Sequence, residues 1–146
     1  MAEATTPVPE KETTYPENRM FGYSLPSYGL YVRHVKNLVV ENFHFNLLSP
    51  DARPAIVLDD CHNIRINNFY ADQPSNNQPL LHVIQSTNII FSGYQATTSI
   101  SKFLKIEGEK SSDIKLTGND FSHVKNVFEL SDECKTSTVK EMFNFK

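Results

Sequence analysis

The chain has 146 residues, of which 39% are hydrophobic and 21% are charged, and its formal net charge is -3. This length suits one domain with a single core and is too short for two ordinary domains. Domains that bind a nucleic-acid backbone normally carry a surplus of basic residues, so the slight acidic excess argues against a nucleic-acid partner. No apolar run approaches the roughly 20 residues that cross a bilayer, so we expect a soluble protein without membrane contact.

The first segment, residues 1–27, is rich in proline, glutamate and threonine. Its prolines, Pro7, Pro9, Pro16 and Pro26, fix backbone angles and remove amide donors, which disfavours helices and central strands. We therefore predict an extended N-terminal arm over residues 1–27. The start of the arm lacks the continuous apolar run of a signal peptide, and the sequence leaves the compartment open.

From Tyr28 onward, short runs rich in β-branched and aromatic residues alternate with turn residues, and no window has helical spacing. One set of runs begins at Leu38, Ile64, Ile89, Ile114 and Val139, which gives a repeat of roughly 25 residues. A second set precedes it, beginning at Leu30, Ile56, Leu81, Leu104 and Phe128. A third short segment follows, marked by Phe43, Phe69, Tyr94 and Phe121. We therefore expect three short strands in each repeat.

A strand-only repeat of this length indicates a solenoid, because one such unit is too small to bury its apolar face alone. Leucine-rich repeats need a dense leucine pattern that is absent here, and propeller blades need four strands over a longer repeat. The remaining architecture is an all-β, parallel β-helix of about five coils over residues 28–146.

Side chains of the first strand in each repeat are expected to alternate between the interior and the outer face. The predicted interior ladder is Leu30, Val32, Ile56, Leu58, Leu81, Val83, Leu104, Ile106, Phe128 and Leu130. The predicted outward row is Tyr31, Arg33, Val57, Asp59, His82, Ile84, Lys105, Glu107, Glu129 and Ser131. This row fits either the solvated face of a sheet or a surface that binds a polar oligomer lying across the coils. For the second case, the candidate binding residues are Tyr31, Arg33, Asp59, His82 and Lys105.

The residues before the second strand are suited to a bend, and Asn37, Asn63 and Asn88 are expected to stack their amides along the axis rather than bind a ligand. The two cysteines, Cys61 and Cys134, lie about three coils apart. This separation is roughly 14 Å at the spacing between paired strands, too long for a disulfide. We therefore expect two unpaired thiols.

Three segments carry a family resemblance, namely Tyr15–Gly22, Leu25–Asn37 and Pro50–Ile56. They are similar to the C-terminal part of bacterial glycoside hydrolase family 28 proteins, which are polygalacturonase-like pectin hydrolases. The resemblance runs from about Pro7 to at least Tyr94. It implies a right-handed parallel β-helix and an acidic plant polysaccharide, galacturonan, as the partner. Relatives of this kind are typically exported.

The motifs that would supply catalysis in this family are missing as a set from the chain. The resemblance implies aspartates in an Asn-Thr-Asp motif and an Asp-Asp pair, completed by Gly-His-Gly and Arg-Ile-Lys motifs, all on earlier coils. Asp59 and Asp60 imitate the pair, but they follow the first strand instead of preceding it, so we expect a turn and surface role. We predict no catalytic residue and no cofactor. Nor do we predict a metal site, because no histidine has a cysteine or histidine partner at the spacing of metal ligands. The five histidines are His34, His44, His62, His82 and His123.

Two functional hypotheses follow from the resemblance. In the first, the chain is the C-terminal β-helix portion of a polygalacturonase-like protein and serves as a structural or carbohydrate-contacting module. In the second, it is part of an active galacturonan hydrolase whose catalytic coils come from a missing N-terminal segment or another chain. For this chain alone we predict no enzyme activity.

The ends of such a solenoid expose unpaired backbone and apolar side chains, which invites self-association through the open N-terminal coil. The arm is expected to fold over that end, anchored by Tyr15, Met20 and Phe21. At the other end, a second set is expected to close the core, consisting of Met142, Phe143 and Phe145.

Overall fold

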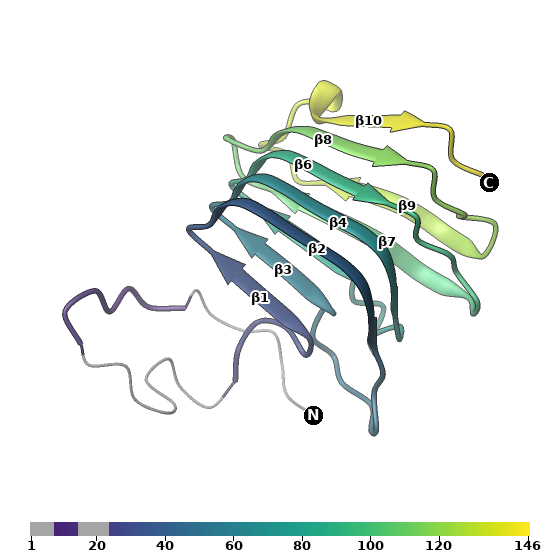
Figure 1. Ribbon diagram of the computed structural model, residues 1–146, viewed down its shortest axis with the longest axis horizontal. Helices are drawn as coiled ribbons and strands as arrows, with labels where there is room; N and C mark the ends of the chain where they lie inside the picture. Colours follow the sequence, from purple (N-terminus) through teal and green to yellow (C-terminus); the bar gives the residue numbers. More distant parts are fainter. Residues whose placement is uncertain (1–7, 15–23) are drawn as a thin grey trace.

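The computed structural model describes residues 8–14 and 24–146, and within them ten strands form two five-stranded parallel sheets (Figure 1). The first sheet, here called sheet A, is built from β1 (Leu30–Arg33), β3 (Ile56–Asp59), β5 (Leu81–Ile84), β7 (Ile100–Glu107) and β9 (Val124–Leu130). The second, sheet B, is built from β2 (Lys36–Phe45), β4 (His62–Ala71), β6 (Thr87–Ser92), β8 (Ser112–Thr117) and β10 (Val139–Met142).

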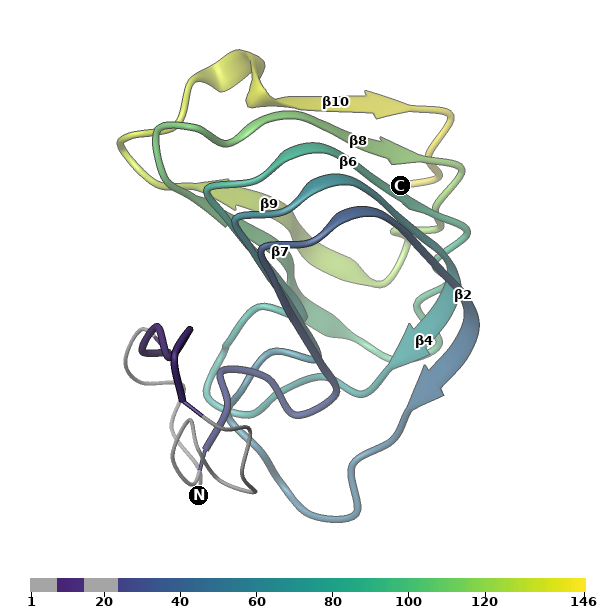
Figure 2. The same cartoon turned by 60° about the vertical axis from the view of Figure 1, so that its left-hand side comes forward.

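Each turn of the chain contributes one strand to sheet A and the next to sheet B, so the sheets face each other across a common interior (Figure 2). The register in sheet B pairs Leu38 with Ile64, Ile64 with Ile89, Ile89 with Ile114 and Ile114 with Val139. This register is the one that the sequence repeat predicts. The chain is therefore a parallel β-helix of about five coils, as expected.

Helical structure is confined, in the described residues, to a single turn of 3-10 helix, η1 (Thr136–Thr138). No helix in this part of the chain is long and apolar enough to cross a membrane.

The interior ladder of sheet A lies where the alternation predicts it. Seven of its side chains are almost fully shielded from solvent, namely Val32, Ile56, Leu58, Leu81, Val83, Leu104 and Ile106. Leu30, Phe128 and Leu130 are only partly buried, because the end coils have a neighbour on one side alone. On the outer face, Val57 departs from the prediction. It points away from the core and yet is 1% exposed, and it lines a groove described below.

The third side of the coil differs from the prediction of a third strand in every repeat. In the first two coils, β2 and β4 continue past a bend at Asn42 and Asn68, which have φ of 59° and 48°. In the next two coils the bend is Gly93 and then Gly118, and strand pairing stops just before each. Beyond the bend only isolated bridges remain, from Gln95 to Asp120 and from Asp120 to Phe145.

A column of aromatic rings runs along this third side through all the coils that it joins, including those where strand pairing has stopped. The rings of Phe69 and Tyr94 lie 5.2 Å apart, and that of Phe43 stacks on Phe69 at 5.6 Å. Phe103, from β7, joins the column at 4.8 Å from Tyr94 and 4.9 Å from Phe121. Rings at these spacings attract one another in addition to burying apolar area, so they hold the coils together where backbone pairing is sparse.

The bend between the sheets follows the prediction in four of the five coils. Asn37, Asn63, Asn88 and Asp113 have φ of 61°, 57°, 55° and 52°, a region that asparagine and aspartate enter at little cost. The amide of Asn63 donates to Asn37 Oδ1 at 2.7 Å, and that of Asn88 donates to Asn63 Oδ1 at 3.1 Å. The predicted stack of amides along the axis is therefore present.

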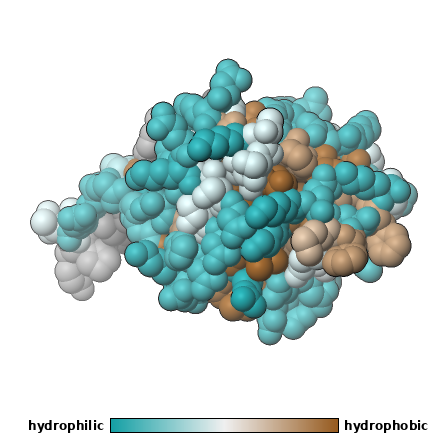
Figure 3. Space-filling model, turned by 90° about the horizontal axis from the view of Figure 1, so that it is seen from above, coloured by the Kyte–Doolittle hydropathy of each residue, from teal (hydrophilic) through white to brown (hydrophobic). Residues whose placement is uncertain are grey.

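The C-terminal end is not closed by the three apolar residues expected to cover it. Met142, Phe143 and Phe145 are 50%, 84% and 74% exposed, and Figure 3 shows apolar surface gathered toward one side of this end. The repeat explains the error. Met142 pairs with the outward Thr117, Phe143 takes the bend position with φ of 56°, and Phe145 bridges to Asp120.

One inward place of the last strand is taken by Val139 and the other by a charged residue. Glu141 pairs in register with the buried Leu116, and its carboxylate lies 2.9 Å from Lys146 Nζ. An inward charge at the last strand is a known way of blunting a sheet edge. The expected anchors of the N-terminal end, Tyr15, Met20 and Phe21, lie outside the described residues.

The amide stack predicts a measurable stability effect at Asn63. Asn63→Gly keeps the positive φ but removes both side-chain hydrogen bonds, whereas Asn63→Ala removes the bonds and also strains the backbone. We expect Asn63→Gly to lower the free energy of unfolding by about 1–2 kcal/mol. We expect Asn63→Ala to lower it by about 1 kcal/mol more. Urea unfolding would measure both, and equal losses would contradict the left-handed bend.

Candidate functional site

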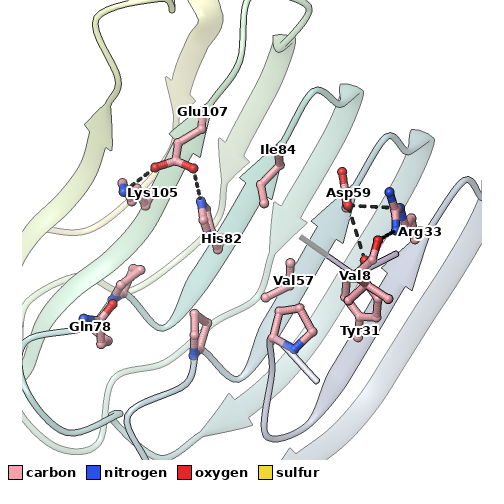
Figure 4. A pocket seen from close by; sticks show the side chains of 13 residues that line it. Val8, Tyr31, Arg33, Val57, Asp59, Gln78, His82, Ile84, Lys105 and Glu107 are labelled. Carbon is pink, nitrogen blue, oxygen red and sulfur yellow. Dashed lines mark hydrogen bonds and ion pairs between the residues drawn. The ribbon is translucent and has the colours of Figure 1, made fainter. Parts of the chain in front are cut away.

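A groove of about 540 Å³ runs over the outer face of sheet A, and all five predicted binding residues line it (Figure 4). Tyr31 and Arg33 come from β1, Asp59 from β3, His82 from β5 and Lys105 from β7. The groove therefore crosses the first four coils. The remaining lining residues are Val8, Pro26, Pro54, Val57, Gln78, Pro79, Ile84 and Glu107.

Strand register arranges the outward side chains in two columns along the axis. One column contains Tyr31, Val57, His82 and Lys105, and the other contains Arg33, Asp59, Ile84 and Glu107. Neighbouring strands lie about 4.8 Å apart, so each column brings side chains from successive coils into contact. The groove thus has polar groups at both ends and the apolar Val57 and Ile84 between them.

At the β1 end, one carboxylate organises two of its neighbours. Asp59 Oδ2 accepts a hydrogen bond from the Tyr31 hydroxyl at 3.3 Å and lies 3.2 Å from Arg33 Nε. Burial of the phenol, together with the negative charge of Asp59, raises the pKa of Tyr31 to about 12. Tyr31 therefore stays protonated across the ordinary pH range and acts as a hydrogen-bond donor with an aromatic face.

At the β7 end, Glu107 contacts two basic side chains. Its carboxylate lies 3.0 Å from His82 Nε2 and forms an ion pair with Lys105 Nζ. Burial opposes ionisation of Glu107, but the hydrogen bond and charge of Lys105 and the charge of His82 outweigh it and lower the pKa of Glu107. Burial also dominates at His82 and lowers its pKa below the usual value, in spite of Glu107. At neutral pH this end therefore holds one cation, one carboxylate and an uncharged imidazole.

The N-terminal arm reaches the β1 end of the groove. Val8 is 7% exposed and lines the groove, and its carbonyl accepts a hydrogen bond from Arg33 Nη1. Glu10 Oε1 lies 2.5 Å from Arg33 Nη2 and 2.9 Å from His34 Nε2. The described part of the arm therefore contacts the outer face of sheet A.

Asp59 and Asp60, the pair that imitates a catalytic motif, have different roles. Asp59 supports Tyr31 and Arg33 in the groove, whereas Asp60 lies in the turn with φ of 49° and contacts His34 Nδ1 at 2.7 Å. The two carboxylates thus serve different neighbours. The turn and surface role predicted from the sequence is what the structure shows for Asp60.

The sequence interpretation missed the walls of the groove and the part played by the arm. Pro54 and Pro79 occupy the same place in successive repeats, each just ahead of a strand of sheet A, so the repeat itself held a signal for one wall. No comparable pattern marks Val8 or Glu10. They precede the first repeat, and their contacts with Arg33 do not follow from its spacing.

Other reactive groups lie away from the groove. Cys61 is buried, and burial raises the pKa of its thiol, while Cys134 is partly exposed; both are free thiols. Within residues 8–14 and 24–146, no group of three or more histidine, cysteine, aspartate or glutamate side chains is arranged to hold a metal ion.

Comparisons with known proteins return no match, whether the chain is compared with protein-family models, with curated proteins or with solved structures. The architecture therefore comes from the structure itself, which is compatible with families built on a parallel β-helix. The ligand of the groove therefore has to be inferred from the side chains that line it. On that basis the chain is a parallel β-helix protein with a polar groove across the outer face of sheet A.

Proposed function

We propose that this chain is the C-terminal β-helix portion of a polygalacturonase-like protein and that it contacts carbohydrate without cleaving it. The ligand is an acidic oligosaccharide of the galacturonan type, lying across the coils in the groove of sheet A. The observation that carries this proposal is the convergence of Tyr31, Arg33, Asp59, His82 and Lys105 on one groove.

The chemistry of the groove suits a sugar chain more than a compact ion. An aromatic ring, two cations and two carboxylates supply a stacking face, donors and acceptors, the mixture that hydroxyl-rich ligands require. Arg33 and Lys105 lie on strands three coils apart, which is roughly 14 Å along the axis. A ligand that contacts both is longer than a single sugar ring, and carboxylates on it would match both cations.

The carboxylates near the groove do not favour hydrolysis. Inverting glycoside hydrolysis needs one carboxylic acid with a raised pKa and one carboxylate to activate water. The pKa values of Glu10 and Glu107 are both lowered, the former by its hydrogen bond from His34 and the latter by Lys105 and His82. Both shifts are opposite to the shift that makes a general acid.

The alternative function, a part of an active galacturonan hydrolase, has one specific observation in its favour. The inward residues of β2, Leu38, Val40 and Phe43, are apolar and only partly buried. At the other end of sheet B, the inward place is taken by Glu141. The asymmetry favours the addition of further coils on the β2 side, where catalytic motifs would lie.

Binding is tested by titrating the purified chain with galacturonate oligomers and following heat release or amide chemical shifts. We expect Lys105→Met to weaken binding by about fivefold, the contribution of one charge pair of about 1 kcal/mol. Lys115→Met is the matched control, because Lys115 lies on the outer face of sheet B and is also paired with a carboxylate. Equal affinities for both variants would place the ligand outside the groove.

Catalysis is tested by reducing-sugar release from polygalacturonate. We expect none from this chain alone, since Glu107 in the groove has a lowered pKa, whereas proton donation needs a raised one. Turnover at enzyme-like rates would overturn the carbohydrate-contacting assignment. An in-frame upstream segment with Asn-Thr-Asp and Gly-His-Gly motifs would favour the alternative, and its addition to the chain should then restore activity.

The open edge of β2 supports self-association as a further property. Val39 on this edge is exposed, and within residues 8–14 and 24–146 β2 pairs with β4 alone. We expect light scattering to show association that grows with protein concentration and is reduced by Val39→Lys, because a lysine on an edge strand disfavours pairing. Leu48→Lys, at an exposed apolar residue outside the strands, is the control. A monomer at all concentrations would contradict the proposal.

A further inference from the structure

Arg33 presents different edges of its guanidinium to the sheet and to the arm. Its Nε atom lies 3.2 Å from Asp59, a residue of sheet A. Both terminal nitrogens contact the arm instead, Nη1 through the carbonyl of Val8 and Nη2 through the carboxylate of Glu10 at 2.5 Å. The two terminal nitrogens form the fork that binds a carboxylate in bidentate fashion. The arm therefore occupies the position that a carboxylate ligand would take.

The contact is of the kind that another ligand can displace. The side chain of Glu10 is 53% exposed, and exposed ion pairs are weak because water screens them. His34 adds a second contact at 2.9 Å and is itself held by Asp60. Hydrogen bonds with these two carboxylates raise the pKa of His34, and the bond from His34 lowers the pKa of Glu10. The arm is thus attached by several small interactions at the mouth of the groove.

The ion pair between Glu10 and Arg33 changes the charge that an anionic ligand meets in the groove. Arg33 and Lys105 are balanced by Asp59 and Glu107, so the groove without the arm is close to neutral when His82 is uncharged. Glu10 adds a negative charge beside Arg33. An acidic oligosaccharide therefore meets an excess of negative charge at this end while the arm is in place.

We propose that the arm competes with the acidic oligosaccharide for the groove. The carboxylate of Glu10 occupies the position at Arg33 that would bind a carboxylate of the ligand. This inference rests on the proposed function of the groove and adds its regulation. Binding of the oligosaccharide releases Glu10 from Arg33, and the contact of Arg33 with Asp59 stays in place. Loss of the Glu10 charge frees Nη2 of Arg33, while the carbonyl of Val8 stays on Nη1 until the ligand displaces the arm.

The test compares full-length Glu10→Gln with the wild-type chain in calorimetric titrations with trigalacturonate. We expect about two- to fivefold tighter binding in the variant, the range that corresponds to one exposed ion pair. Glu12→Gln is the matched control, since Glu12 is an exposed acid on the same arm, whereas the ion pairs of Arg33 within the described residues are with Glu10 and Asp59. In an Arg33→Gln background, Glu10→Gln should have no further effect. A neutral galactose trimer should bind both chains equally.

Each outcome separates the inference from the function on which it rests. Binding of trigalacturonate that is equal or weaker in Glu10→Gln overturns the competition and leaves the groove function standing. Equal tightening for the neutral trimer overturns the role of Glu10 as a carboxylate competitor. Absence of binding in the wild-type chain and in every variant overturns the proposed function, and the competition with it. The nuclear magnetic resonance signal of Arg33 Nε should shift in Glu10→Gln and stay unchanged in Glu12→Gln, and an unchanged signal in both would show that the contact does not form.

Discussion

The register between successive coils is the constraint on which the rest of this structure depends. Ile64, Ile89 and Ile114 lie on one line because their strands pair without a shift. In a strand, a slip of one residue would exchange the inner and outer faces, placing the core in water and charges in the interior. The same register that stacks the core also stacks the bend asparagines and brings the groove residues together. Core, bends and groove are therefore three consequences of one repeat.

The repeat also explains why the two ends behave differently from the middle. An interior coil is covered on both sides, whereas in the described part of the chain β1, β2, β9 and β10 each pair on one side alone. At the last coil, the inward position that holds Leu116 one turn earlier holds Glu141, which is tolerated because no further coil covers it. At the first coil the inward residues remain apolar. The last coil thus carries an inward charge beside exposed apolar residues, Met142, Phe143 and Phe145, whereas the inward residues of the first coil are all apolar.

The groove differs from an ordinary sheet face in how its charges are arranged. Each cation has a carboxylate within ion-pair distance, Arg33 with Asp59 and Glu10, and Lys105 with Glu107. Paired charges keep side chains in fixed positions and lower the cost of holding them near partly buried surface, but they also reduce the pull on an anionic ligand. In the proposed mode of binding, an anionic ligand replaces one of these existing partners. The arm contact at Arg33 is the pair that reaches outside the sheets, and so it is the most easily replaced.

The sequence alone determined the solenoid, its period, the direction of each first-strand side chain and the asparagine bends, because each depends on spacing along the chain. The same spacing defined the outward columns, and five residues chosen from them line one groove. It did not determine the third side, where the strands continue past Asn42 and Asn68 but give way to isolated bridges after Gly93 and Gly118. Nor did it place the C-terminal aromatics, whose position in the repeat overrides their preference for the interior. Only the tertiary structure decided that Val8 and Glu10 meet Arg33, since that contact lies outside the repeat and depends on how the arm crosses the sheet.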